Sequence, residues 1–133
     1  MTPEAERSLA KARLTLEHAR TMLTVELAED AGRAAYLAGY HAAEAFIFER
    51  TGKVTKTHKG VHTEFARLAM NEPAFDLELR RFLPRAYDLK AICDYGVGPD
   101  AVVPLEKAAA AVDEAERFLD CVAGLVGTPR PPV

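Results

Sequence analysis

The chain has 133 residues, of which 49% are hydrophobic, so it has the length and apolar content of one globular domain. A formal net charge of −3 and a pI of about 5.8 exclude the broad basic field of proteins that capture nucleic acid non-specifically or read DNA. The two cysteines, Cys93 and Cys121, lack the spacing of a disulfide framework, and no signal peptide or membrane-spanning stretch is evident. We therefore expect a cytoplasmic protein with no membrane partner.

Thr2 and Pro3 predict the start of the first helix, because threonine is a common N-cap and proline is tolerated in the first turn. Apolar residues then recur every three or four positions as far as Leu27, as on one face of a helix: Ala5, Leu9, Ala12, Leu16, Ala19, Leu23 and Leu27. A second, partly apolar row is not explained by a single core and could contact another subunit: Leu14, His18, Met22 and Val25.

The next predicted helix is apolar on nearly all sides, which indicates a central and mostly buried position. Asp30 is its expected N-cap, its apolar stretch extends from Ala34 to Phe48, and Gly52 supplies a C-terminal stop. Few polar groups interrupt that stretch: Tyr36, Tyr40, His41 and Glu44. A polar loop from Lys53 to Thr57 leads to a shorter helix around Val61, Phe65, Leu68 and Ala69.

The fourth predicted helix ends at Tyr95 and Gly96, and its apolar residues follow helical spacing: Phe75, Leu79, Phe82, Ala86, Leu89 and Cys93. Pro84 lies inside this helix and removes one backbone N–H. We therefore expect either a kinked helix or two short helices end to end.

After a loop at Gly96–Pro99, Pro104 begins a final helix that Gly127 closes. Its predicted apolar face comprises Leu105, Ala108, Val112, Ala115, Leu119, Val122 and Val126. These elements predict an all-α fold, an up-and-down bundle of about five helices in which residues 1–127 form one domain. Residues 128–133 are rich in proline and are expected to form a disordered tail.

Three short motifs occur in order along the chain: Tyr40-His41-Ala42-Ala43-Glu44-Ala45-Phe46-Ile47, Thr57-His58-Lys59-Gly60-Val61, and Asp94-Tyr95 at a helix end. Together they resemble HEPN domains, specifically the branch often labelled an uncharacterised helical protein family, from about Leu9 to Leu125. The resemblance implies a symmetric dimer that is often encoded beside a minimal nucleotidyltransferase in a toxin–antitoxin pair. In relatives an Arg-Ala-Tyr-Tyr motif lies one position nearer to the histidine, so Arg33 has no clear role here.

The resemblance also implies a site. Catalytic HEPN domains carry an arginine and a histidine four to six residues apart near a helix end, and these cleave RNA at the dimer interface. The equivalent stretch here has Lys90 and Asp94, followed by Tyr95, and these three are the catalytic candidates. A carboxylate is a poor general acid near neutral pH and repels phosphate, so we expect no efficient metal-independent RNA cleavage. Lys90 and Asp94 also have the i,i+4 spacing of an ordinary ion pair.

In some relatives the nucleotidyltransferase attaches a nucleotide to a tyrosine just beyond the motif histidine, which makes Tyr95 the candidate acceptor. Further candidates for binding a ligand or partner are Tyr40, His41, His58, Lys59 and Arg85. For His41, a hydrogen bond to a neighbouring backbone group or tyrosine is the simpler expectation.

His58 and His62 are four residues apart and could share one helix face around a metal, but no third ligand is evident. A hydrogen-bonded or solvent-facing pair is favoured, and no metal or cofactor is predicted. Arg13 and His18 match the loose spacing of the ribonuclease motif, but they lie on the first helix and would point about 140° apart.

The sequence therefore predicts a non-catalytic HEPN dimer that binds a nucleotidyltransferase, with nucleotide or RNA as a further ligand. Two alternatives remain: a ribonuclease toxin with a modified motif, and a plain helical interaction domain.

Overall fold

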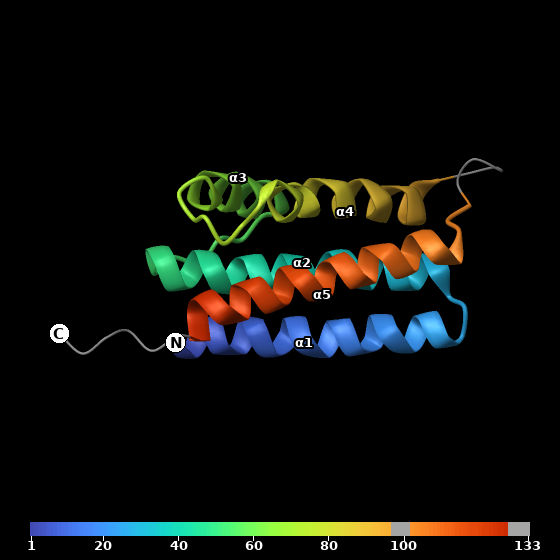
Figure 1. The fold of residues 1–133 in the computed structure, drawn as a ribbon, viewed down its shortest axis with the longest axis horizontal. Helices are drawn as coiled ribbons and strands as arrows, with labels where there is room; N and C mark the ends of the chain where they lie inside the picture. Colours follow the sequence, from blue (N-terminus) through green and yellow to red (C-terminus); the bar gives the residue numbers. More distant parts are fainter. Residues whose placement is uncertain (97–101, 128–133) are drawn as a thin grey trace.

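The computed structural model describes residues 1–96 and 102–127, which form five helices (Figure 1). They are α1 (Pro3–Thr24), α2 (Ala28–Thr51), α3 (His58–Ala69), α4 (Leu77–Tyr95) and α5 (Leu105–Gly127). No strand occurs in these two ranges, so the predicted all-α bundle is confirmed. The predicted tail at 128–133 and the loop at Gly96–Pro99, apart from its first residue, lie outside the described residues.

The central helix of the bundle is α2, which contacts each of the other four helices. Helices α1 and α5 pack against α2 and against each other, while α3 and α4 follow one another along a different side (Figure 1). The four long helices alternate in direction, which gives the predicted up-and-down topology. Most buried positions of α2 are small, so its neighbours can approach closely: Ala31, Gly32, Ala34, Ala35, Ala38, Gly39, Ala42, Ala43 and Ala45.

Five phenylalanine rings form the core where α2, α3, α4 and α5 meet. The Phe118 ring of α5 has centroid distances of 5.2 Å to Phe65, 5.9 Å to Phe75 and 5.1 Å to Phe82. Phe46 of α2 completes the group at 5.1 Å from Phe75. All five residues are buried. This cluster joins the α3–α4 side of the bundle to α5, and Phe118 lies beside the apolar row that we predicted for α5 rather than within it.

The junction of α1 and α2 differs from the prediction, in which the first helix extends to Leu27 and Asp30 caps the second. Helix α1 ends at Thr24, and Glu26 adopts a left-handed φ of 62°. The Leu27 N–H then donates to the Met22 carbonyl at 2.8 Å, which satisfies one of the last carbonyls of the helix. Glycine is the usual residue at such a left-handed position, so a glutamate gives no stop signal. Helix α2 consequently begins before Asp30, which lies in its first turn.

Two further expectations need correction. Helix α4 contains Pro84 but is continuous, so the alternative of two short helices is wrong. Its N-cap is Asp76, whose side chain accepts the Leu79 N–H at 2.8 Å, and Phe75 precedes the helix while remaining fully buried. Leu105, predicted on the buried face of the last helix, is the first residue of α5 and is 37% exposed.

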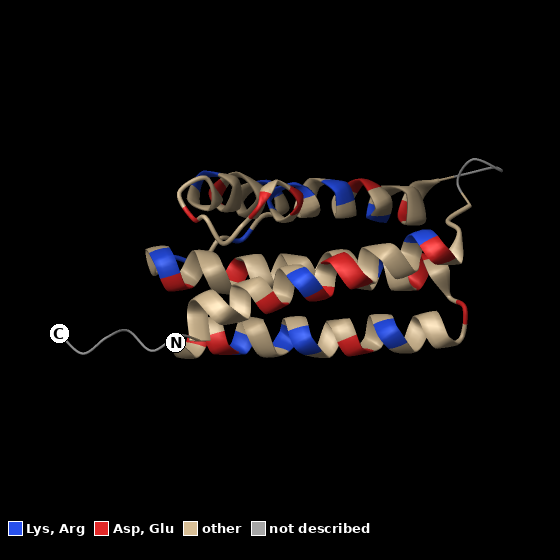
Figure 2. Ribbon diagram, viewed as in Figure 1, with Lys and Arg blue, Asp and Glu red and all other residues tan. Residues whose placement is uncertain are grey.

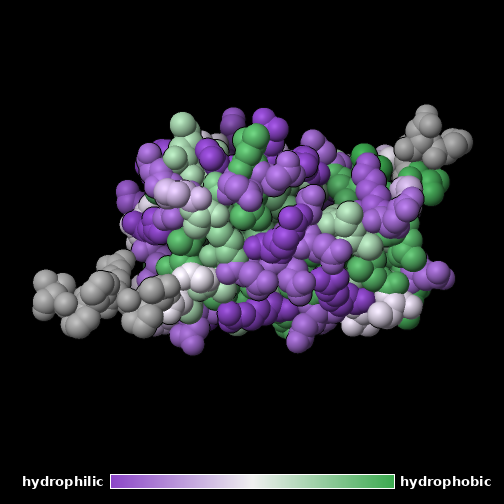
Figure 3. Space-filling model, in the orientation of Figure 1, coloured by the Kyte–Doolittle hydropathy of each residue, from purple (hydrophilic) through white to green (hydrophobic). Residues whose placement is uncertain are grey.

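Charged residues of both signs are interspersed along the outer surfaces of the helices (Figure 2). Hydrophobic side chains nevertheless reach the surface at the end of the bundle where α1 joins α2 and α5 begins (Figure 3): Val25, Leu27, Val102 and Leu105. The C-terminal end of α4, with exposed Ile92 and Tyr95, lies at the same end (Figure 1). Within the described ranges, none of the helices has the length and hydropathy needed to cross a membrane.

Gly39 allows α4 to lie close against α2. A Cβ placed on Gly39 would lie only 2.2 Å from Cε2 of the Phe82 ring, which is itself buried in the aromatic core. We expect Gly39→Ala to lower the free energy of unfolding by about 1–3 kcal/mol, because the added methyl group would force the buried Phe82 ring away from α2 and disturb its packing.

Gly124→Ala is the matched control in urea denaturation. Gly124 is exposed in α5, and a Cβ there meets nothing within 4 Å. The better helix propensity of alanine should therefore raise stability by about 0.5–1 kcal/mol. Equal stability of the two variants would contradict the close approach at Gly39.

Candidate functional site

Four charged residues meet where the C-terminal end of α4 lies against α2. This Asp94 cluster consists of Asp30 and Arg33 from α2 and of Lys90 and Asp94 from α4. Arg33 donates through Nε to Asp94 Oδ1 and through Nη1 to Asp30 Oδ1, both at 2.6 Å. Lys90 Nζ donates to the other Asp94 oxygen, Oδ2. The predicted i,i+4 ion pair between Lys90 and Asp94 is therefore present. Arg33 of α2 forms a second ion pair with the same carboxylate.

The two cations keep the Asp94 carboxylate ionised. Hydrogen bonds from Lys90 and then from Arg33 hold the pKa of Asp94 below its ordinary value of 3.8. Asp94 in turn raises the pKa of Lys90 above its ordinary value of 10.5. Neither group therefore exchanges a proton near neutral pH, which is what acid–base catalysis requires. Two acidic and two basic side chains also leave the cluster without net charge.

Arg33 is the member of this cluster that the sequence prediction leaves without a role. Its partner Asp94 is 61 residues away in the chain, so only the packing of α2 against α4 brings the two together. The neighbouring Gly32 offers a signal in the sequence. A Cβ there would lie 3.2 Å from the Cys93 sulfur, so glycine permits the close approach that lets Arg33 reach Asp94.

A second group of side chains joins α2, α3 and α4 and is called here the Tyr36 cluster: Tyr36, Tyr40, His58, His62 and Tyr87. Tyr36 is fully buried, and its hydroxyl is hydrogen-bonded to His58 Nδ1 at 2.8 Å and to His62 Nε2 at 3.0 Å. The ring centroid of Tyr40 lies 4.5 Å from that of His58, and Tyr87 meets Tyr36 edge to face at 5.3 Å. The histidine pair of α3 is therefore hydrogen-bonded to a single phenol.

The Tyr36 hydroxyl has only one proton, so it donates to one imidazole and accepts an N–H from the other. Burial raises the pKa of Tyr36 far above its ordinary value of 10.0, so the phenol stays neutral. Burial also lowers the pKa of His62 below 6.5, and His58 lowers it further, while Asp88 acts in the opposite direction. Near neutral pH the cluster is a chain of hydrogen bonds in which His62 carries no charge.

A pocket of about 240 Å³ lies beside this cluster and is lined by His58, Lys59, His62, Thr63 and Tyr87. The structure therefore brings together three of the predicted ligand-binding residues, since Tyr40 packs on His58 and Lys59 lines the same pocket as His58. Tyr87 and His62 had no predicted binding role. Within the described ranges, no group of three or more His, Cys, Asp or Glu side chains is arranged to hold a metal ion.

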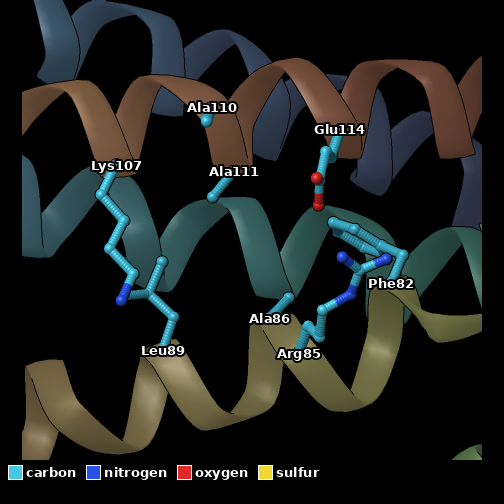
Figure 4. Close-up of a pocket in the computed structure, with 8 residues that line it drawn as sticks. All are labelled: Phe82, Arg85, Ala86, Leu89, Lys107, Ala110, Ala111 and Glu114. Carbon is cyan, nitrogen blue, oxygen red and sulfur yellow. The ribbon is translucent and has the colours of Figure 1, made fainter. Parts of the chain in front are cut away.

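The other two predicted binding residues lie apart from the Tyr36 cluster pocket. His41 Nδ1 is hydrogen-bonded to Glu44 Oε1 of the same helix at 2.7 Å, so a backbone or tyrosine partner for that atom is wrong. Arg85 lines a separate groove of about 170 Å³ between α4 and α5, where Figure 4 shows its guanidinium close to Glu114. Arg85 also donates to Glu78 Oε2 at 2.9 Å, so nearby carboxylates already balance its charge.

Tyr95 is 80% exposed at the end of α4, next to Asp94, so a partner protein can reach its hydroxyl. Arg13 and His18 are exposed on α1 and belong to neither cluster.

A family model described as the HEPN domain matches residues 5–125, a range that contains both clusters. The protein belongs to the HEPN domain family. No curated protein shows significant similarity to the chain. In this HEPN domain the residues at the end of α4 are Lys90, Asp94 and Tyr95, and Asp94 is bound both to Lys90 and to Arg33 of α2.

His62 gives the stability of the HEPN domain a pH dependence. Its folded-state pKa lies below 6.5, so below about pH 6.5 the unfolded chain binds more protons than the folded one. The free energy of unfolding should therefore be highest above that pH and should fall as the pH decreases. Urea denaturation between about pH 7 and pH 5.5 measures the slope, which we expect to be smaller in His62→Gln.

Asp88→Asn is the matched variant. The Asp88 carboxylate raises the pKa of His62 and so partly offsets the effect of burial. Without it, the free energy of unfolding should fall more steeply with decreasing pH than in the unmodified chain. Identical slopes in all three proteins would contradict a titrating role for His62.

Proposed function

We propose that this HEPN-domain protein is the non-cleaving subunit of a prokaryotic, toxin–antitoxin-like two-component module. In this proposal it forms a symmetric dimer and binds a minimal nucleotidyltransferase. The observation that carries the proposal is the Asp94 carboxylate, held between Lys90 and Arg33 at the position where the resemblance to catalytic HEPN domains requires a histidine.

The geometry argues against RNA cleavage in two ways. A general acid needs a proton to give, and Asp94 has a lowered pKa and is ionised near neutral pH. A phosphate-binding cation must be available to the substrate, yet Lys90 and Arg33 are both paired with Asp94, and Arg33 also binds Asp30. Binding an RNA phosphate there would require these ion pairs to break beside a carboxylate that repels it.

The surface near this cluster supports a role in assembly. Hydrophobic residues are exposed at the same end of the bundle, in the α1–α2 junction, near the end of α4 and at or just before the start of α5: Val25, Leu27, Ile92, Val102 and Leu105. Exposed apolar side chains gathered at one end are typical of surfaces that contact another protein. Tyr95 is exposed among them, which supports it as the residue that a nucleotidyltransferase partner would modify.

A cleavage assay tests the first half of the proposal. Purified protein incubated with RNA and a metal chelator should show no cleavage above that of Asp94→Ala and Lys90→Ala, because neither Asp94 nor Lys90 exchanges a proton near neutral pH. Expression should likewise arrest growth no more than either variant does. RNA cleavage or growth arrest that either substitution abolishes would favour the ribonuclease alternative.

Size-exclusion chromatography with the product of the neighbouring gene tests the second half. We expect a dimer that forms a stable complex with that product. After co-expression, intact-mass measurement should show one added nucleotide on the chain and none on Tyr95→Phe, with Tyr87→Phe as the control tyrosine. A strict monomer that does not bind the neighbouring gene product would overturn the proposal and favour a plain interaction domain.

A further inference from the structure

The Tyr36 hydroxyl connects α3 to α2 by hydrogen bonds. It meets His58 Nδ1 at 2.8 Å and His62 Nε2 at 3.0 Å, and within residues 1–96 and 102–127 no other hydrogen bond links α3 to another helix. Tyr36 is fully buried, so bulk water does not replace a lost partner of its hydroxyl. The attachment of α3 at this end therefore depends on how one oxygen and two nitrogens share their protons.

A single added proton is compatible with this arrangement. With both imidazoles neutral, one donates an N–H to the phenol oxygen, and the other accepts the phenol proton. The first proton binds the far nitrogen of the donating imidazole and leaves both hydrogen bonds intact. A second proton has to bind the nitrogen that accepts from the phenol. Both imidazoles then present an N–H to the oxygen, and the buried phenol proton is left without an acceptor.

The surroundings also oppose a second positive charge. The titratable and charged groups that face the histidine pair come from three helices: Tyr36 and Tyr40 of α2, Lys59 of α3, and Arg80, Tyr87 and Asp88 of α4. The phenols are uncharged in acid, and Lys59 and Arg80 are positive. Asp88 supplies a negative charge, but burial and His58 together hold the pKa of His62 below its ordinary value. The positive N-terminal end of α3 adds to this opposition at His58.

The first turn of α3 is the part of the helix that these hydrogen bonds hold. Within His58–Val61 only Val61 is buried, and the preceding residues Gly52–Val54 are exposed. Farther along the helix, Phe65 is 2% exposed and packs in the phenylalanine core. The later turns therefore stay anchored when the first turn loses its hydrogen bonds to Tyr36.

We propose that the Tyr36 cluster is an acid-sensitive latch. It holds the first turn of α3 against α2 while the histidine pair carries at most one added proton, and it releases that turn when both histidines are protonated. The pocket of about 240 Å³ is lined by four residues of α3 and by Tyr87 of α4, so release removes one of its walls. Acidification thus dismantles the pocket without unfolding the bundle. The proposal goes beyond the effect of His62 on overall stability and does not depend on assembly at the end of α4.

An NMR pH titration of the full chain is the first test. The ring signals of His58 and His62 should report two protonation steps at least about one pH unit apart, because the second proton leaves the phenol proton without an acceptor. The second step should coincide with loss of hydrogen-exchange protection at the Val61 amide, which donates to the Thr57 carbonyl at 2.9 Å. The ring signals of Phe118 should stay unchanged, because the core remains folded.

His58→Gln and His18→Gln are a matched pair of variants. Glutamine at position 58 keeps a hydrogen-bonding side chain but takes up no proton. The Val61 amide should therefore keep at least about tenfold more protection at about pH 5 than in the unmodified chain. His18 is exposed on α1, outside the Tyr36 cluster, so His18→Gln should release α3 at the same pH as the unmodified chain.

Tyr36→Phe and Tyr40→Phe test the phenol itself. Without the Tyr36 hydroxyl, the Val61 amide should lose about tenfold or more of its protection already near neutral pH. Tyr40→Phe should retain that protection, because its ring still packs on His58 at a centroid distance of 4.5 Å. Thermal unfolding shows whether each variant is folded, and the His58→Gln result decides the matter if Tyr36→Phe is not.

Three outcomes overturn the proposal. The first is a single protonation step for both histidines with unchanged Val61 protection, and the second is release of α3 at the same pH in His58→Gln and His18→Gln. The third is loss of the Phe118 signals together with Val61 protection, since the whole bundle then unfolds at once. Complex formation with the neighbouring gene product is measured at neutral pH, so either proposal can fail alone.

Discussion

The central position of α2, which packs against all four other helices, is the constraint on which the rest of this HEPN domain depends. Alanine and glycine at most of its buried positions let the surrounding helices approach its backbone, and the close contact of Gly39 with the Phe82 ring is one result. Polar groups in such a helix need specific partners. Arg33 and Tyr36, one turn apart on α2, find theirs on α4 and α3, and each organises one of the two clusters.

The two clusters differ in how their charge is used. In the Asp94 cluster every charged group faces an opposite charge, so proton exchange and phosphate binding are both disfavoured. In the Tyr36 cluster the groups form a hydrogen-bonded chain beside Lys59, which has no ion-pair partner within residues 1–96 and 102–127. One flank of α4 connects them, because Tyr87, Lys90 and Asp94 follow helical spacing.

Prediction from the sequence succeeded where the signal is local. The Thr2 cap and the Gly52 stop are confirmed, because each depends on one side chain or one φ angle. It failed where local rules are overridden. Glu26 takes a left-handed conformation usual for glycine, and the sequence left open whether Pro84 divides α4, which is continuous. No pattern in the neighbouring residues predicts either outcome.

The sequence by itself determined the all-helical class, the order of the five helices and the family, since these follow from periodicity and short motifs. The resemblance also predicts that the Asp94 carboxylate stands where a catalytic relative has an imidazole. Only the tertiary structure decided which groups act together. The pairing of Arg33 with Asp94 and the joining of His58 and His62 through Tyr36 span 61, 22 and 26 residues of chain. Such contacts arise from packing between helices. That packing determines the partner and the pKa of each group, and periodicity within one helix cannot encode it.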